Sequence, residues 1–81
     1  MKVRIRLFAQ MRLAGGASTF EVDLPHGAVL REALETFYEV HPGLRAYRPS
    51  ALAAVGWEYS AEDLPLKDGD EISLIPPVQG G

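Results

Sequence analysis

The chain has 81 residues, of which 47% are hydrophobic and 23% charged, and this composition predicts one small globular domain. Its net charge of −3 argues against nucleic acid as the main partner, and its lack of cysteine excludes disulfides and thiolate metal sites. The first six residues alternate charged and apolar side chains and no apolar run is long enough to span a membrane, so we expect a cytoplasmic protein.

The start of the chain predicts a β-hairpin. Apolar and polar residues alternate over residues 2–8 and again over residues 19–24, which is the period of strands with one buried face. Pro25 ends the second strand. The segment between the strands, residues 9–17, contains Gly15 and Gly16 and is expected to be a connecting loop. A phosphate-binding role for this glycine pair is disfavoured, because the lysine and following helix of a P-loop are missing.

Residues 28–40 carry the one clear helical pattern. Four apolar residues recur at the spacing of a single helix face: Leu30, Ala33, Leu34 and Phe37. We interpret this face as core rather than as a cofactor site. Pro42 and Gly43 end the helix, and an irregular surface loop is expected over residues 44–50.

The second half of the chain predicts three short strands. Residues 51–55 form the first, and Gly56 turns the chain into a short return strand that carries Trp57 and Tyr59. These two aromatic residues form either a binding patch or a cover for the thin core. Asp68 and Asp70 are interpreted as turn residues, since no further ligands fall at EF-hand positions. Residues 71–75 form the last strand, with Ile72 and Leu74 facing inward.

The predicted element order is β-β-α-β-β-β. The first and last strands are the most apolar, so we place them side by side in the centre of a mixed five-stranded sheet, with the helix packed on one face. This is an α+β fold of the β-grasp, or ubiquitin-like, architecture over residues 1–75. The opposite face carries Phe8 and Ile75 among charged neighbours, and exposed apolar groups of this kind favour a docking surface.

Residues 76–81 are predicted to form a flexible C-terminal tail. Pro76 and Pro77 cannot donate ladder hydrogen bonds, so the last strand ends near Ile75. Gly80 and Gly81 have no side chains and suit a narrow channel. The tail then offers one reactive group, the carboxylate of Gly81, which is inert until it is activated and therefore predicts an adenylating partner enzyme.

The body of the chain shows no catalytic motif. His26 and His41 have no motif that links them to a nucleophile, the serines lack a nucleophile-elbow context, and no metal site is indicated. Any reaction must therefore involve the tail or a pocket of a partner protein.

Four segments together resemble the family of molybdopterin synthase small subunits, which are ubiquitin-like sulfur carriers of the MoaD/ThiS group. The resemblance covers the chain in order, and the closing Pro-Pro-Val-x-Gly-Gly is its most specific part. Gly56 departs from it, because many relatives carry asparagine there. The segments are residues 7–10 with Arg12, 52–55, 65–71 and 75–81.

The resemblance implies a sulfur-carrier function and a set of partners. An activating enzyme would use ATP to adenylate Gly81, and a sulfur donor protein would convert it to a thiocarboxylate. The chain itself would bind no cofactor. Gly81 would then deliver sulfur to a cyclic pyranopterin precursor in molybdenum cofactor biosynthesis, inside a pocket of the large synthase subunit and within a heterotetramer.

The implied site residues lie in the tail and on the open sheet face. Gly80 and Gly81 are the expected reactive end. The residues expected to contact the large subunit are Phe8, Ile75, Pro76, Pro77 and Val78.

Two alternatives stay open from the sequence. The first is a sulfur carrier for another acceptor, such as tRNA or the thiazole of thiamine. The second is a ubiquitin-like modifier or interaction module whose tail is joined to protein lysines.

Overall fold

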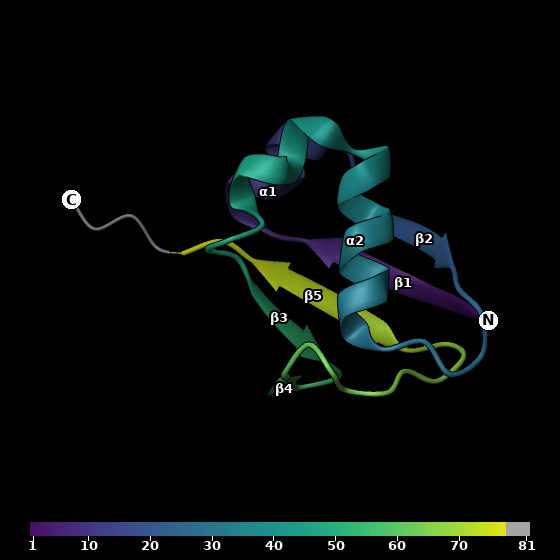
Figure 1. The fold of residues 1–81 in the computed structure, drawn as a ribbon. Helices are drawn as coiled ribbons and strands as arrows, with labels where there is room; N and C mark the ends of the chain where they lie inside the picture. The colour runs from purple at the N-terminus through teal and green to yellow at the C-terminus, as the bar shows by residue number, and fades with distance from the viewer. Residues whose placement is uncertain (78–81) are drawn as a thin grey trace.

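The computed structural model describes residues 1–77, which form a five-stranded sheet with helices packed against it (Figure 1). The strands are β1 (Lys2–Leu7), β2 (Thr19–Asp23), β3 (Leu52–Val55), β4 (Glu58–Tyr59) and β5 (Glu71–Ile75). The helices are α1 (Ala9–Gly15), α2 (Leu30–Val40) and the 3-10 helix η1 (Pro42–Tyr47). No helix in this described part of the chain has the length and apolar character that crossing a membrane requires.

The strand order is β2-β1-β5-β3-β4, with β1 and β5 parallel and side by side in the centre. The pairs β1–β2, β3–β4 and β3–β5 are antiparallel. Helix α2 lies across one face of the sheet, as the long connection between β2 and β3 allows (Figure 1). The predicted β-grasp architecture, including the central position of the first and last strands, is confirmed.

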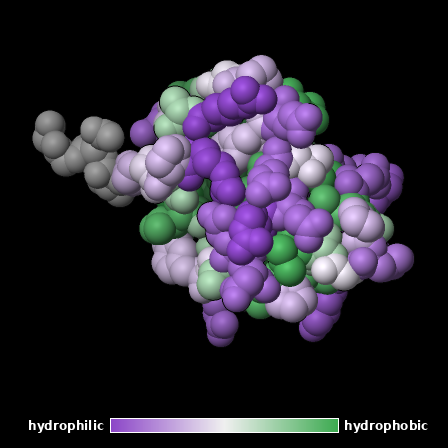
Figure 2. Space-filling model, viewed as in Figure 1, coloured by the Kyte–Doolittle hydropathy of each residue, from purple (hydrophilic) through white to green (hydrophobic). Residues whose placement is uncertain are grey.

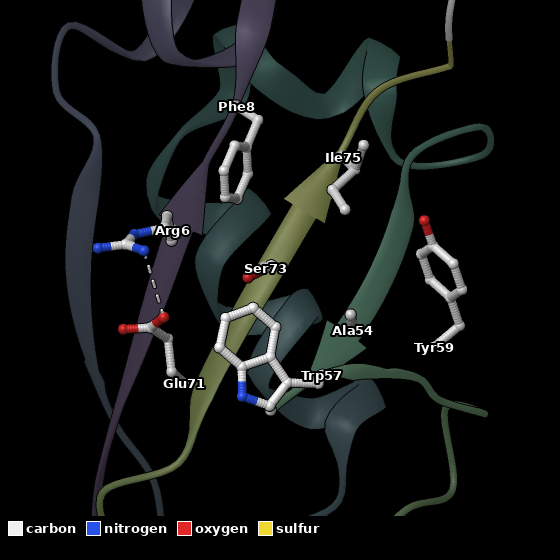
Figure 3. A pocket seen from close by; sticks show the side chains of 9 residues that line it. Arg6, Phe8, Ala54, Trp57, Tyr59, Glu71, Ser73 and Ile75 are labelled. Carbon is white, nitrogen blue, oxygen red and sulfur yellow. Dashed lines mark ion pairs between the residues drawn. The ribbon is translucent and has the colours of Figure 1, made fainter.

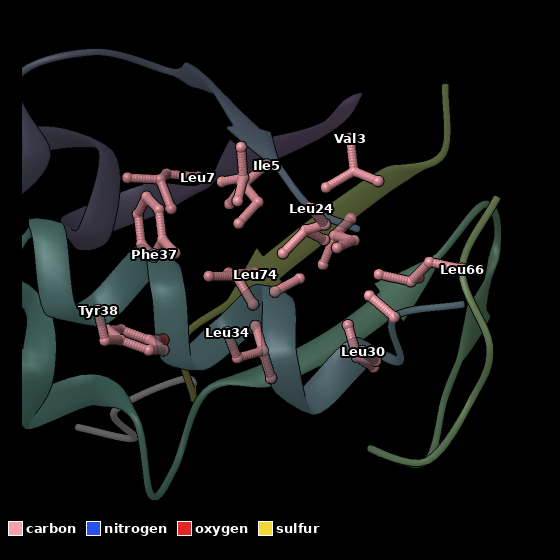
Figure 4. Close-up of a cluster of buried hydrophobic side chains, with 14 of the residues drawn as sticks. Val3, Ile5, Leu7, Leu24, Leu30, Leu34, Phe37, Tyr38, Leu66 and Leu74 are labelled. Atoms are coloured by element: carbon pink, nitrogen blue, oxygen red, sulfur yellow. The ribbon is translucent and has the colours of Figure 1, made fainter. Parts of the chain in front are cut away.

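The core lies between α2 and the inward face of the sheet (Figure 4). Strand β1 alternates exposed and buried residues, and Ile72 and Leu74 of β5 are buried beside it, as predicted. All four residues of the predicted helix face are buried, together with Tyr38. Burying one such aliphatic side chain stabilises the fold by about 2 kcal/mol. The remaining α2 positions and η1 present a largely hydrophilic surface (Figure 2).

Helix α2 begins two residues later than the sequence pattern indicated. Its first turn is stabilised by the Glu32 carboxylate, which accepts a hydrogen bond from the Val29 N–H at 3.1 Å. The helix ends at His41, whose N–H donates to the Phe37 carbonyl oxygen at 3.0 Å. The residue after His41 is Pro42, which disfavours helical geometry at His41 and accounts for the stop.

The prediction of a loop over residues 9–17 was wrong, because residues 9–15 form helix α1. All of its first six residues, Ala, Gln, Met, Arg, Leu and Ala, are strong helix formers. Gly16 ends the helix with φ +79°, where its N–H donates to the Arg12 carbonyl oxygen. The Met11 side chain is fully buried, so α1 covers one end of the core.

The irregular loop predicted after α2 is also partly wrong, since residues 42–47 form η1. Pro42 occupies the first turn, where its missing N–H needs no partner. Leu44 is buried against the core, which fixes this short helix beside α1. An ion pair between Arg48 and Glu62, with nitrogen–oxygen distances of 3.1 and 3.3 Å, then ties the end of this segment to the loop that follows β4.

Gly56 makes the tight turn between β3 and β4. Its φ of +64° lies in the left-handed region, which glycine and asparagine adopt more readily than other residues. The glycine at this position therefore meets the same backbone requirement as the asparagine that the resemblance led us to expect.

Candidate functional site

The sheet face opposite α2 carries a hollow of about 500 Å³ that is open to solvent (Figure 3). Within residues 1–77 no helix packs over this face. The hollow combines an apolar floor with aromatic walls and a charged flank. It is lined by Arg6, Phe8, Ala54, Gly56, Trp57, Tyr59, Glu71, Ser73 and Ile75.

Two central strands place Phe8 and Ile75 together. Leu7 is in register with Leu74 and both point into the core, so the next residue on each strand turns to the opposite face. The predicted position of Phe8 and Ile75 on the face away from the helix is confirmed, and both line the hollow. Phe8 is 39% exposed, so much of its ring is available to a partner.

The backbone changes direction immediately after Phe8. Phe8 is extended, with φ −126° and ψ 156°, and Ala9 has φ +52° at the start of α1. Ala9 is the one non-glycine residue with positive φ among those the structure describes. Such a conformation costs about 1–2 kcal/mol, and the surrounding packing must compensate for it. The turn leaves the Phe8 ring over the hollow while α1 departs to cover the end of the core.

Trp57 and Tyr59 come from the β3–β4 hairpin and line the same hollow. Trp57 is 101% exposed and Tyr59 67% exposed, so neither ring covers the core. The sequence left open whether these two aromatic residues form a binding patch or cover the core, and the structure excludes a role in covering the core. Large exposed aromatic side chains beside an apolar floor are typical of protein interfaces.

A charged flank borders the hollow along β1. Arg4 and Arg6 each lie 3.7 Å from a carboxylate oxygen of Glu71. These side chains are between about one-third and three-fifths exposed, so solvent screens the pairs and each contributes little to stability. Exposed charges beside an apolar surface can orient a docking partner, because charge complementarity fixes register and excludes wrong partners.

Sequence reasoning missed the role of Arg6, Ser73 and Glu71 in this site. The signal was present, because the same alternation that buries Ile72 and Leu74 sends the residues between them to the opposite face. What the alternation does not supply is the neighbour of each residue, which depends on the register between β1 and β5.

The predicted tail begins at the edge of this hollow. Strand β5 ends at Ile75, Pro76 is buried against the body, and Pro77 is exposed. Of the residues expected to contact a partner, Pro76 is thus packed into the body while Pro77 is accessible. Val78, Gly80 and Gly81 lie outside the described residues.

The alternative sites considered from the sequence have structural roles. Asp68 accepts a hydrogen bond from the Lys2 N–H and Asp70 accepts one from the Lys67 N–H, each at 2.7 Å, so both carboxylates brace the turn before β5. His41 packs against Phe20 and Phe37, with ring centroids 4.6 Å away from each. In the described part of the chain, no three His, Asp or Glu residues are arranged to hold a metal ion.

Comparisons with known proteins agree with this architecture. The chain is 35% identical to the molybdopterin synthase sulfur carrier subunit of Escherichia coli, with 98% of this chain and 99% of that protein covered. The crystal structure of small archaeal modifier protein 1 from Haloferax volcanii superposes with a TM-score of 0.91 at 28% identity, and the match covers 100% of both chains.

A third similar structure comes from a complex. It is that of subunits 1 and 2 of the molybdopterin-converting factor from Helicobacter pylori, with a TM-score of 0.74, 30% identity and 100% of both chains covered. The ThiS family matches residues 5–81, which is nearly the whole sequence. The protein therefore belongs to the ThiS family.

Proposed function

We propose that this protein is the sulfur-carrying small subunit of a molybdopterin synthase, with Gly81 as its reactive residue. The observation that carries the proposal is the apolar hollow beside Ile75, the last residue of β5, which the sequence Pro-Pro-Val-Gln-Gly-Gly follows directly. The name of the E. coli relative, which is matched over nearly its whole length, supports the same function.

Chemistry at Gly81 proceeds in two activation steps. ATP and a partner enzyme convert the carboxylate to an acyl-adenylate with release of pyrophosphate, because a free carboxylate does not react with nucleophiles. A sulfur donor protein then supplies sulfide-level sulfur that displaces AMP and leaves a thiocarboxylate. ATP is used by the activating enzyme and this chain binds none. We also place the protein in the cytoplasm, where ATP is available.

The thiocarboxylate then transfers its sulfur inside the large subunit. Sulfur is more polarisable than oxygen, so this terminus is a good nucleophile at neutral pH. Its sulfur attacks an electrophilic carbon of a cyclic pyranopterin precursor and displaces an oxygen substituent there, which forms a thioester between the precursor and Gly81. Water then cleaves the acyl C–S bond of this thioester, so that the sulfur stays on the precursor and the Gly81 carboxylate is regenerated. Acids, bases and oxyanion donors for this step come from the large subunit, because its pocket encloses the reacting terminus.

Docking to the large subunit uses the hollow. Phe8 and Trp57 supply exposed apolar surface beside Ile75, and the exposed Pro77 lies two residues after it. The Helicobacter pylori complex of subunits 1 and 2 supports this partner class, and we propose a heterotetramer with two copies of each subunit.

Precursor conversion tests this proposal. The thiocarboxylated chain plus a large subunit should convert the cyclic pyranopterin precursor. Variants that lack Gly81 or carry one extra residue after it should be inactive while unfolding at the same temperature as the parent. Phe8→Ala, with Gly81 intact, should raise the large-subunit concentration needed for half-maximal conversion. Full activity in the extended variant would contradict the assignment of Gly81.

A second candidate function is protein modification. The structure of the Haloferax volcanii small archaeal modifier protein 1 is the specific observation in its favour. Incubation with the activating enzyme and cell extract separates the two functions. Conjugates joined through Gly81 to lysines support the modifier, whereas a thiocarboxylate without conjugates supports the sulfur carrier. If the carrier is thiocarboxylated yet the pyranopterin precursor is not converted, another acceptor such as tRNA or a thiazole becomes the better assignment.

A further inference from the structure

The sequence contains only two lysines, Lys2 and Lys67, against six arginines. Both lysines lie at the end of the sheet where β1 begins, and β5 ends at the opposite end (Figure 1). The Gly69 N–H donates to the Lys2 carbonyl oxygen at 2.8 Å, which places Lys2 level with the turn before β5. The α-amino group of Met1 lies at this end too, where it donates to the Leu24 carbonyl oxygen at 2.6 Å.

The separation between these amines and the start of the tail is large compared with the tail's length. From the level of Gly69 to Pro76 the extended chain covers about 23 Å. Pro76 is buried against the body, so the segment that can reach back is residues 77–81, which span at most about 17 Å. A lysine stem adds roughly 6 Å. Only a tail and a lysine both stretched to the limit and folded straight back reach each other, and the effective concentration is then close to zero.

The cations close to the end of β5 are of a different kind. Arg6 lines the hollow beside Ile75. A guanidinium stays protonated at every physiological pH and is not a nucleophile, whereas a lysine amine reacts in its small neutral fraction.

We propose that the fold protects the activated terminus from its own amines by holding Lys2, Lys67 and the Met1 amine at the far end of the sheet. The reaction avoided is aminolysis. An amine nitrogen attacks the Gly81 carbonyl carbon, the new C–N bond replaces the bond to the leaving group, and the amine loses a proton. An internal amide of this type would close the chain into a dead-end ring. The lysines stay accessible to the terminus of a second molecule.

This inference concerns the activated state that the proposed function requires, but its test needs no activating enzyme. A C-terminal thioester of the full chain, prepared by intein cleavage, stands in for the activated carboxyl. Three chains are compared at low micromolar concentration: the parent, Ser50→Lys and Asp23→Lys. Ser50 is exposed and precedes Leu52, the partner of Ile75 in the β3–β5 register, so it lies beside the tail. Asp23 is exposed and pairs with Lys2 at the far end.

Intact mass and peptide mapping give the readout. The parent and Asp23→Lys should yield the hydrolysed acid, while Ser50→Lys should yield a product lighter than the acid by one water, with an amide between Gly81 and residue 50. We expect at least a tenfold faster loss of thioester in Ser50→Lys. An internal amide at Lys2, Lys67 or Met1 in the parent, or equal behaviour of the two lysine variants, would overturn the proposal. Equal unfolding temperatures of the three chains confirm that both variants are folded. Failure of Gly81 to be thiocarboxylated in cells would instead count against the proposed function alone.

Discussion

At the scale of single residues, function and stability depend on different side chains. The fully buried residues belong to the core, and the residues of the hollow contribute little to it. Trp57 is the clearest case, because its ring is 101% exposed and loses no packing when it is removed. Truncating a residue of this kind therefore tests docking without disturbing the fold.

Trp57→Ala should leave the free energy of unfolding within about 0.5 kcal/mol of the parent and weaken binding to the large subunit about tenfold or more. Titration calorimetry measures the affinity, and urea denaturation measures the stability. Leu13→Ala is the matched control, because Leu13 is 78% exposed but does not line the hollow. If the two variants bind the large subunit with equal affinity, Trp57 is not part of the interface.

Tyr38 gives a prediction about pH. Burial raises the pKa of the Tyr38 hydroxyl above its usual value of 10.0, and the nearby Arg48 guanidinium opposes the shift without cancelling it. A raised folded-state pKa means that the unfolded chain releases this proton first as the pH rises. The resulting contribution to stability is complete below pH 10 and is lost as the pH rises through the folded-state pKa.

The test compares the parent with Tyr38→Phe, which keeps the ring and has no proton to lose. The difference in unfolding free energy between the two proteins should be constant below pH 9 and move in favour of the phenylalanine variant above pH 10. Chemical denaturation at a series of pH values measures it. A difference that does not change up to pH 11 would contradict the assignment of burial as the dominant cause.

At the scale of elements, the β3–β4 hairpin depends on the backbone of one residue. A Cβ atom added at Gly56 would meet no atom within 4 Å beyond its chain neighbours, so the main cost of substitution comes from its φ of +64°. Gly56→Val should destabilise the protein by about 1–2 kcal/mol, because a β-branched residue strongly disfavours positive φ. Gly56→Asn should lower the stability of the protein much less than Gly56→Val. Denaturation midpoints check the pair, and equal losses would show that conformation at this turn does not limit stability.

Two elements show which parts of the secondary structure can be predicted from the sequence. Strand β5 was predicted with its observed bounds, because Ile72 and Leu74 alternate with polar residues and Pro76 supplies a stop. Helix α1 was missed because it spans only two turns, too short for a periodic pattern, and because Gly15 and Gly16 look like loop residues. Gly16 is in fact the residue that ends the helix. Met11 is an apolar residue in this segment and could have indicated a buried helix, but its burial depends on contacts with distant parts of the chain.

At the scale of the whole molecule, the fold assigns different tasks to different surfaces. One sheet face is covered by α2 and forms the core, and the other is the open hollow. The lysines lie at one end of the central strands, and β5 ends at the other. Alternation within β1 and β5 was enough to predict that Phe8 and Ile75 share a face. The addition of Trp57 and Tyr59 to that face required the strand order, which brings β3 and β4 beside β5.

Conversion of Gly81 to a thiocarboxylate changes the mass of the intact chain, and a mass measurement can detect this change. The protein is incubated with ATP, an activating enzyme and a sulfur donor, and is then analysed with its C-terminal peptide. We expect replacement of one oxygen by one sulfur, located at Gly81 and dependent on ATP. An unchanged mass in a mixture that converts the pyranopterin precursor, or sulfur located at any other residue, would contradict this expectation.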